Sequence, residues 1–286
     1  MEYYRDVLDH GVVEVDDYFG SDLDVARIAR ISTGQGNKTP EADAKFIDYL
    51  YRHGHMSPFE MPVIRFKIKM PIFVARQWFR HRSASPNEYS GRYSEMIDEC
   101  YVPEPERLMA RDTDNRQASG GVRDPKLAET LSGIMRGDML IAGDGYKTVL
   151  ANGAPRELAR TVLPLSTYTL FFWQQNLRNL FHLLALRLHA HAQWETRQYA
   201  QAVYALTKQR FPLSCAAFEE HTLNAVTLSA QEIAIVREAL QSEPGAIAEI
   251  ERDLRGPQYA ALAGNASRRH AFLRKLWIDE PTEEEA

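Results

Sequence analysis

Apolar and basic side chains alternate strictly along one segment of the chain, between Pro62 and Pro71. The apolar positions are Ile64, Phe66, Ile68 and Met70, and the basic positions are Arg65, Lys67 and Lys69. Because successive side chains of a β-strand point to opposite faces of a sheet, this period of two predicts a strand with one buried face. The predicted strand leads directly into a segment rich in arginine.

Most of the remaining chain shows helical patterns. Val12, Val13 and Val15 suggest a second, short strand. Apolar stripes bounded by capping residues, prolines and glycines predict helices after Ser21 and over Thr39–Gly54, Asp124–Asn152, Ala154–Leu163, Gln174–Ala190, Trp194–Arg210 and Ser267–Ile278. A capping box of Ser229 and Glu232 begins one more helix. These elements favour an α+β fold in a single domain, with helices packed on a modest, mostly antiparallel sheet.

The composition is that of an ordinary soluble globular protein, since 44% of the 286 residues are hydrophobic and 26% are charged. The chain has no apolar run long enough to cross a membrane, and its first residues lack the features of a signal peptide. The expected location is therefore the cytoplasm. A net charge of −5 argues against general nucleic-acid binding. Cys100 and Cys215 are expected to be reduced thiols.

The segment from Arg76 to Ser94, RQWFRHRSASPNEYSGRYS, has the least ordinary composition in the chain. Pro71 suits the first turn of a helix that ends near Arg82, and the residues after it are expected to form a loop. Arginine carries a rigid fork of donors that matches phosphate or carboxylate oxygens, so this cluster indicates a bound anionic small molecule. The alternative is a solvated basic turn paired with neighbouring carboxylates.

The predicted helix from Gln174 to Ala190 also carries unusual polar residues. At about 100° per residue its polar side chains fall on two opposed faces, with Asn176, Arg187 and His191 on one and Arg178, His182 and His189 on the other. Such a helix is expected between two sites or two subunits. The alternative is a core helix with snorkelling arginines and hydrogen-bonded histidines.

Two other chemistries are less well supported by the sequence. The pairs His53/His55 and His189/His191 have the residue type of a metal site, but no Asp, Glu or Cys cluster completes a ligand set, so no metal is expected. Ser90 and Cys100 are candidate nucleophiles. His55 is the only attractive base for Ser90, and Cys100 has no evident activator, so structural roles are favoured for both.

The arginine-rich segment resembles a known family. Arg80-His81-Arg82, followed after seven residues by Ser90, matches the RHR-x7-S motif of the flavin-dependent thymidylate synthases. Neighbouring positions that resemble the family are Gln77, Asn87, Glu88 and Arg92. The resemblance extends from about Ser32 to Gln198 and is interrupted by a divergent section between Pro103 and Ala154. It implies a domain over residues 1–224, with a divergent loop at about 103–125 that we expect to be mobile, and a helical extension over 225–286.

The resemblance also implies roles for individual residues. The implied FAD contacts are Ser32, Ser57, Glu60, Arg80, His81, Arg82, Ser83, Asn176, Arg178, His182 and His191. The implied dUMP contacts are Gln77, Arg80, Glu88, Ser90, Arg92, Arg160 and Arg187. His55 is expected near the flavin and the folate, so the implied catalytic residues are Arg187, His55 and Ser90. No G-x-G-x-x-G follows a strand, which disfavours a Rossmann-type flavoprotein but is neutral for this family.

The implied activity is the reductive methylation of dUMP to dTMP. Family members use FAD as cofactor, 5,10-methylenetetrahydrofolate as one-carbon donor and NADPH as reductant, and they assemble each site from several chains of a homotetramer. No membrane or nucleic-acid partner is expected. Two alternatives stay open at this point, namely a flavoprotein of the same fold with another reaction and a nucleic-acid-binding module that uses the arginines on phosphates.

Overall fold

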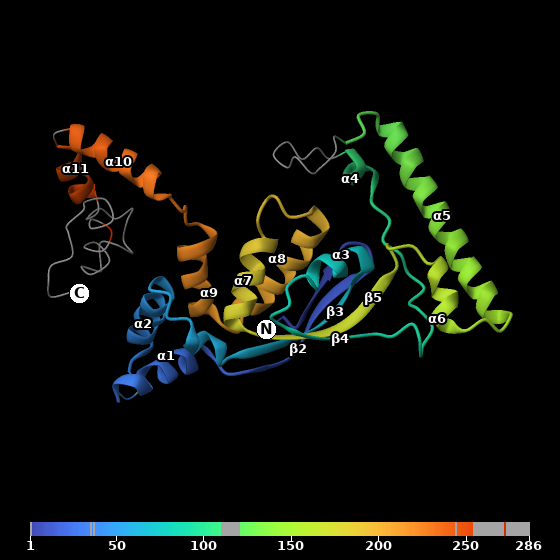
Figure 1. The fold of residues 1–286 in the computed structure, drawn as a ribbon, viewed down its shortest axis with the longest axis horizontal. Helices are drawn as coiled ribbons and strands as arrows, with labels where there is room; N and C mark the ends of the chain where they lie inside the picture. Colours follow the sequence, from blue (N-terminus) through green and yellow to red (C-terminus); the bar gives the residue numbers. More distant parts are fainter. Residues whose placement is uncertain are drawn as a thin grey trace. The chain divides into compact units, whose positions relative to one another are not determined.

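The computed structural model describes residues 2–34, 36, 38–109, 121–243, 245–253 and 272. The chain divides into two compact units, Met1–Ala225 and Val226–Ala286. The first unit contains the sheet and the helices packed on it (Figure 1). In the second unit, α10 (Ala230–Ser242) begins at the predicted capping box of Ser229 and Glu232, and α11 (Ala246–Asp253) follows. The predicted helix Ser267–Ile278 lies outside the described residues apart from position 272.

A five-stranded antiparallel sheet forms the centre of the first unit, in the order β1-β2-β3-β5-β4. The strands are β1 (Tyr4–Val7), β2 (Gly11–Phe19), β3 (Val63–Pro71), β4 (Ser85–Glu88) and β5 (Tyr168–Asn176). The predicted α+β class and the mostly antiparallel sheet are confirmed. The sequence pattern predicts only part of β2 and does not predict β1. It places the residues of the edge strand β4 in a loop.

The central strand β3 has the predicted alternation. Ile64, Phe66 and Ile68 are fully buried, whereas the basic side chains between them are partly exposed. β3 pairs with β5 along its whole length, from Val63 opposite Asn176 to Pro71 opposite Tyr168. The buried face of the sheet is thus continuous across both strands.

Three helices cover this face, namely α3 (Ile72–Trp78), α7 (Leu177–Arg187) and α8 (Trp194–Lys208) (Figure 1). Trp78 of α3 packs against Trp173 of β5 with ring centroids 5.4 Å apart, and both side chains are fully buried. Further helices are α1 (Asp22–Arg30), α2 (Pro40–Arg52), α4 (Pro105–Met109), α5 (Pro125–Ala151), α6 (Arg156–Ala159) and α9 (Pro212–Phe218). Short 3₁₀ turns are formed by Ile31–Thr33, Ser57–Glu60 and Arg160–Val162, and a π-helical turn by Glu219–Leu223.

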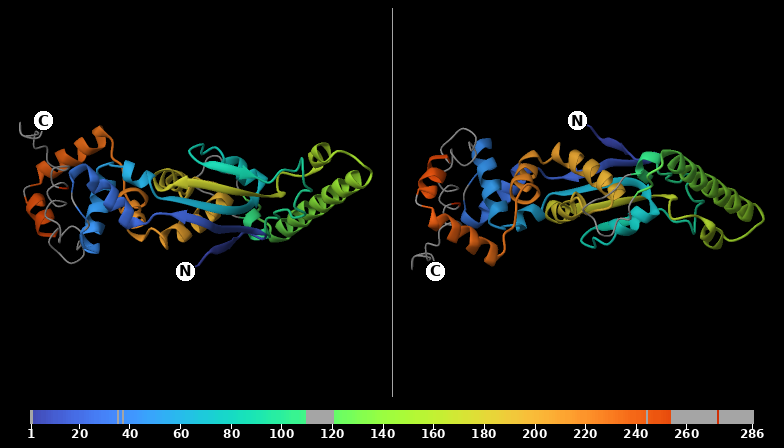
Figure 2. Two further views of the ribbon diagram at one scale, coloured as in Figure 1. Left: turned by 90° about the horizontal axis from the view of Figure 1, so that it is seen from below. Right: turned by 90° about the horizontal axis from the view of Figure 1, so that it is seen from above.

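The two ends of the sheet carry different helices. In both Figure 1 and Figure 2, α1 and α2 lie at one end and α5 and α6 at the other. The predicted helix boundaries at Thr39, Asp124 and Asn152 are confirmed, because Thr39 and Asp124 cap α2 and α5 with their side chains and α5 ends next to Asn152. No helix among the described residues is long and apolar enough to cross a membrane.

Two longer predicted segments also differ from the structure. The helix expected over Gln174–Ala190 begins only at Leu177, because β5 continues to Asn176 to pair with the first residue of β3. The loop expected over 103–125 contains the short helix α4, and residues 110–120 of that loop lie outside the described part of the chain.

Candidate active site

The arginine-rich segment follows α3 and lies beside the sheet. α3 ends at Trp78, which is fully buried, and the ring of Phe79 packs against Phe171 of β5 at 4.8 Å. The chain then turns away from the core, so the side chains of Arg80 and Arg82 are exposed. The predicted helix thus stops earlier than Arg82, because two consecutive core aromatics hold its end against the sheet.

α7 faces this segment. Its leucines at positions 177, 180, 183 and 184 are buried in the core, which leaves His182, Leu186 and Arg187 on the side next to Arg80–Ser83. The sequence placed His182 and Arg187 on nearly opposite faces of the helix, and both side chains nevertheless line one cavity. His182 and Leu186 are one turn apart, and Arg187 is the last residue of α7.

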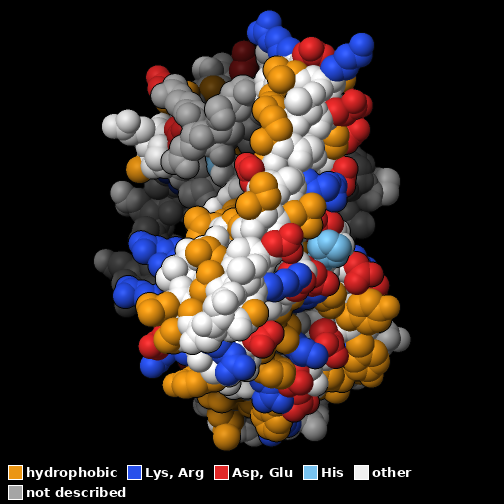
Figure 3. Space-filling model, turned by 90° about the vertical axis from the view of Figure 1, so that its right-hand side faces the viewer, with side chains coloured by type: hydrophobic (Ala, Val, Ile, Leu, Met, Phe, Trp, Pro, Cys, Tyr) orange, Lys and Arg blue, Asp and Glu red, His pale blue; other side chains and the backbone are white. Residues whose placement is uncertain are grey.

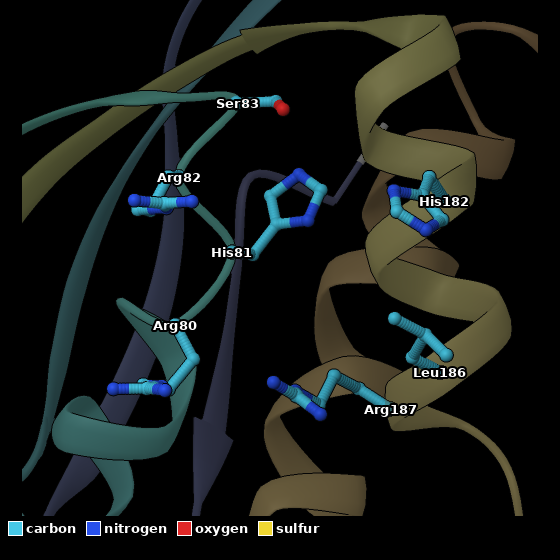
Figure 4. Close-up of a pocket in the computed structure, with 7 residues that line it drawn as sticks. All are labelled: Arg80, His81, Arg82, Ser83, His182, Leu186 and Arg187. Atoms are coloured by element: carbon cyan, nitrogen blue, oxygen red, sulfur yellow. The ribbon is translucent and has the colours of Figure 1, made fainter.

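The cavity between these elements has a volume of about 460 Å³. It is lined by Arg80, His81, Arg82, Ser83, His182, Leu186 and Arg187. In Figure 4, His81 extends toward α7, and Arg187 extends from α7 toward the Arg80–Ser83 segment. Arg80 and Arg82 extend away from α7. The rings of His81 and His182 meet edge to face with centroids 5.5 Å apart. Six predicted site residues therefore lie together, and Leu186 is a lining residue that the sequence did not indicate.

The charge of the cavity comes from its arginines. Burial lowers the pKa of His81 below its ordinary value, and the neighbouring His182 and Arg187 lower it further, so His81 is neutral near pH 7. Burial also lowers the pKa of Arg187, but a guanidinium remains protonated in proteins. The cavity thus offers positive charge and the neutral imidazole of His81, which suits an anionic ligand that carries hydrogen-bonding rings.

A hydrogen bond to the backbone of Gln77 fixes one side of the Arg187 guanidinium. Its Nη2 donates to the backbone oxygen of Gln77 at 2.9 Å, and its buried Nε has no hydrogen-bond partner among the described residues. The buried Nε2 of His81 likewise has none in the described part of the chain. Because buried polar atoms are normally paired, these two atoms mark positions where a ligand can contribute hydrogen bonds.

Gln77 is oriented by α8, which the sequence did not show. Its side-chain amide donates to Gln193 Oε1 and accepts from Thr196 Oγ1 at 3.4 Å. These partners lie 116 and 119 positions away along the chain, so no local pattern connects them. The amide of Gln77 is therefore held in place by α8, while its backbone oxygen orients Arg187.

A second group of predicted residues lies at the first turn of α7. Asn176 caps this helix by accepting from the amide of Asn179 at 3.0 Å, and Arg178 forms an ion pair with Glu60. Glu60 belongs to the 3₁₀ turn that begins at Ser57, so three implied FAD contacts besides Ser57 lie together here. Asn176 acts as a cap rather than as part of a helix face, which corrects the prediction.

A third group lies at the opposite end of the sheet. Glu88 on β4 accepts from Thr169 Oγ1 of β5 at 2.8 Å. Ser90 and Arg92 follow in a tight turn, and Arg160 of the 3₁₀ turn after α6 lies beside that turn. Ser90 Oγ accepts a hydrogen bond from the amide of Arg92 at 3.3 Å, so the hydroxyl hydrogen of Ser90 is available to a ligand.

The remaining predicted residues lie apart from these groups. His55 is exposed, and its ring lies 6.1 Å from that of Tyr49 and 6.3 Å from that of His53. Ser32 is exposed and donates to the backbone oxygen of Ala29. His191 lies beyond the end of α7, stacked on His189 at 4.9 Å. Among the described residues no three His, Cys, Asp or Glu side chains are grouped as for a metal ion.

Known proteins resemble this chain over most of its length. The family model described as thymidylate synthase complementing protein matches residues 14–213. A flavin-dependent thymidylate synthase of Thermus thermophilus is 50% identical over 237 residues, which cover 83% of this chain and 86% of the relative. One of Treponema denticola is 44% identical over 250 residues, which cover 86% of this chain and 94% of the relative.

A solved structure shows the same fold. The crystal structure of the UMP/dUMP methylase PolB from Streptomyces cacaoi, bound with 5-Br dUMP, matches with a TM-score of 0.68 and 31% sequence identity. The match covers 76% of this chain and 98% of the methylase chain. The family match spans most of the chain and includes all three groups of site residues. The chain therefore belongs to the flavin-dependent thymidylate synthases, the thymidylate synthase complementing proteins, and is an enzyme of that family.

Proposed function

We propose that this enzyme methylates C5 of dUMP to give dTMP in the cytoplasm, with 5,10-methylenetetrahydrofolate as one-carbon donor and NADPH as reductant. The observation that carries the proposal is the cavity between α7 and the Arg80–Ser83 segment, with its arginines and its two buried, unpaired nitrogens. The binding of 5-Br dUMP by the structurally similar methylase supports a pyrimidine nucleotide as substrate. Residues 1–224 carry this activity, and a C-terminal extension that contains α10 and α11 follows them.

The cofactor is FAD, and the residues present fit it. A flavin needs donors or positive charge near its pyrimidine ring and cationic groups for its pyrophosphate, and the cavity offers both. Its contacts are Ser32, Ser57, Glu60, Arg80, His81, Arg82, Ser83, Asn176, Arg178, His182 and His191. When bound, the flavin reduced by NADPH supplies the hydride that completes the methyl group.

The nucleotide is held by Gln77, Arg80, Glu88, Ser90, Arg92, Arg160 and Arg187. Arg187 stabilises negative charge on the uracil ring and so favours the electron-rich form whose C5 attacks the one-carbon donor, because its guanidinium is half-buried and fixed through Gln77. Ser90 orients the nucleotide through its free hydroxyl hydrogen. His55 lies near the flavin and the folate, and its exposure leaves the imidazole accessible to them.

The complete site is formed by several copies of the chain. Glu60 and Arg178 lie where β3 begins, whereas Glu88 lies beside Thr169 at the other end of the same strand pair, so within one chain these flavin contacts lie apart from this nucleotide contact. Association of copies brings such groups together, and the expected assembly is a homotetramer.

The surface of the α5–α6 region supports association, because hydrophobic side chains lie among the charged ones there (Figure 3). The exposed ones are Leu127, Ile134, Leu140, Ile141, Leu158, Val162 and Leu165.

The first prediction concerns the visible absorption of the purified protein. We expect a flavin spectrum, and we expect NADPH to bleach it faster with dUMP than without dUMP under anaerobic conditions, because the two ligands occupy communicating sites. Addition of methylenetetrahydrofolate should then give dTMP. UMP is the matched control for dUMP, and it should give less product. A colourless protein that takes up no added FAD contradicts the proposal.

The second prediction concerns Ser90. Ser90→Ala should raise the KM for dUMP about tenfold, the cost of roughly one hydrogen bond, and leave turnover at saturating dUMP within a small factor of the parent value. Steady-state kinetics and calorimetric dUMP binding measure both effects. Ser90→Thr keeps the hydroxyl and should retain most of the affinity. If Ser90→Ala binds dUMP normally and makes no dTMP, the orienting role is wrong.

A further inference from the structure

The segment of residues 89–98, here called the 89–98 loop, connects β4 to the region of α5 and α6. The amide of Tyr89 donates to Leu170 of β5 at 2.8 Å, which fixes the start of the loop to the sheet. The amides of Tyr93 and Ser94 both donate to the backbone oxygen of Ser90 at 3.1 Å. The loop therefore begins with a tight turn that presents Ser90 and Arg92 side by side.

Gly91 brings this turn into close contact with its surroundings. A Cβ atom at Gly91 would lie 2.4 Å from Met96 Sδ and 3.1 Å from Arg160 Cδ. A side chain fits there only if Met96 is displaced, because such distances are shorter than van der Waals contact. The turn, Met96 and Arg160 thus form one packed unit, and a shift of Met96 moves the turn relative to Arg160.

Tyr146 of α5 holds Met96 in place. Its hydroxyl accepts from the amide of Met96 at 2.9 Å, and its side chain is 5% exposed. Most of α5 is exposed, and Tyr146 is one of three buried residues in it, with Ala128 and Ser132. The part-buried hydrogen bond to Met96 is directional, so it specifies the position of the loop on the helix.

The other contacts of the loop with α5 and α6 are exposed ion pairs. They are Asp98 with Lys147 at 2.5 Å, Glu95 with Arg156 at 3.9 Å and Arg92 with Glu157 at 3.3 Å. In each pair both side chains are about half exposed or more, and exposed pairs contribute little because water and salt screen them. They do not replace the buried contact of Tyr146.

We infer that Tyr146 is a positioning residue for the nucleotide, which acts through Met96 and Gly91 to hold Ser90 and Arg92 against Arg160. The inference rests on the proposed function, in which these three residues bind dUMP. Tyr146 does not itself touch the substrate. Its contribution is to keep the three contacts in one arrangement before the nucleotide binds, so that binding does not have to order the loop.

The test is Tyr146→Phe, which removes the hydroxyl and keeps the ring. We expect the KM and the Kd for dUMP to rise about tenfold, since a preorganised set of contacts is lost, while turnover at saturating dUMP changes less than about twofold. Reduction of the flavin by NADPH without dUMP should not change. Tyr199→Phe is the matched control, because it removes another hydroxyl that binds backbone, at Lys69 O and 2.9 Å, on β3 rather than on the loop. It should leave the KM for dUMP unchanged.

A double-mutant cycle with Gly91→Ala tests the route of the effect. Because the added methyl group already displaces Met96, Tyr146→Phe should have little further effect on dUMP affinity in that background. Equal dUMP affinity in Tyr146→Phe and the parent protein overturns the inference, even if the melting temperature falls. If Tyr146→Phe still lowers dUMP affinity tenfold when Gly91→Ala is also present, the inference is likewise overturned. If the parent protein binds no dUMP, the proposed function itself fails.

Discussion

Arg187→Ala should lower the rate of dTMP formation about 10²–10³-fold while the protein remains folded, the size of effect seen when one preorganised donor to a developing charge is removed. Arg187 is fixed through the backbone of Gln77, and its unpaired Nε faces a half-buried site. Its positive charge is strongest where water is excluded, so it acts mainly on the transition state. Anaerobic single-turnover measurements of dTMP at saturating substrates provide the test.

Two controls separate this role from a structural one. Arg187→Lys keeps a positive charge but loses the planar fork, and it should recover only part of the rate. Loss of the hydrogen bond to Gln77 should cost about 1 kcal/mol of unfolding free energy, a small change in the thermal melt. Removal of Arg187 should also raise the pKa of His81, because burial, His182 and Arg187 all lower it. Normal turnover in a folded Arg187→Ala protein contradicts the proposed role.

Elements with a local signal were predicted well from the sequence. The alternation of Ile64, Phe66 and Ile68 is visible because a strand with one buried face needs an apolar residue at every second position. The start of α5 is visible because Asp124 precedes a proline and its carboxylate caps the helix. The cavity residues Arg80–Ser83 were identified because they are contiguous and form a recognisable motif.

Features that depend on distant partners were not predictable in the same way. β5 continues to Asn176, beyond the expected helix start, because β3 offers hydrogen bonds along its whole length. β4 is an exposed edge strand whose residues Ser85–Glu88 carry turn signals, and only pairing with β5 makes it a strand. Glu60 and Arg178 are 118 positions apart, so their ion pair required the fold.

The largest effect on stability is expected at Asp22, which is not among the candidate site residues. Asp22 is the first residue of α1, and its buried carboxylate accepts from the amides of Leu213 and Ser214 at 2.7 and 3.0 Å. It also accepts from Ser214 Oγ at 2.5 Å, so it caps α9 and links the two helices. Asp22→Ala leaves these buried donors unpaired and should lower the unfolding free energy by about 2–4 kcal/mol. Denaturant unfolding measures the change.

Asp22→Asn is the matched control, because it keeps one acceptor oxygen without the ionisable group, and it should be less destabilised than Asp22→Ala.

The difference in unfolding free energy between the parent protein and Asp22→Asn should change with pH in a definite direction. Burial raises the pKa of Asp22 in the folded protein, although hydrogen bonds from Ser214 and Leu213 oppose this. The native state therefore binds more protons than the unfolded state above the unfolded pKa of about 3.9. The stability of the parent relative to Asp22→Asn should fall as pH rises from that value through the folded pKa. If the parent protein instead becomes more stable relative to Asp22→Asn as pH rises over this range, folding favours the charged form of the Asp22 carboxylate, which contradicts the prediction.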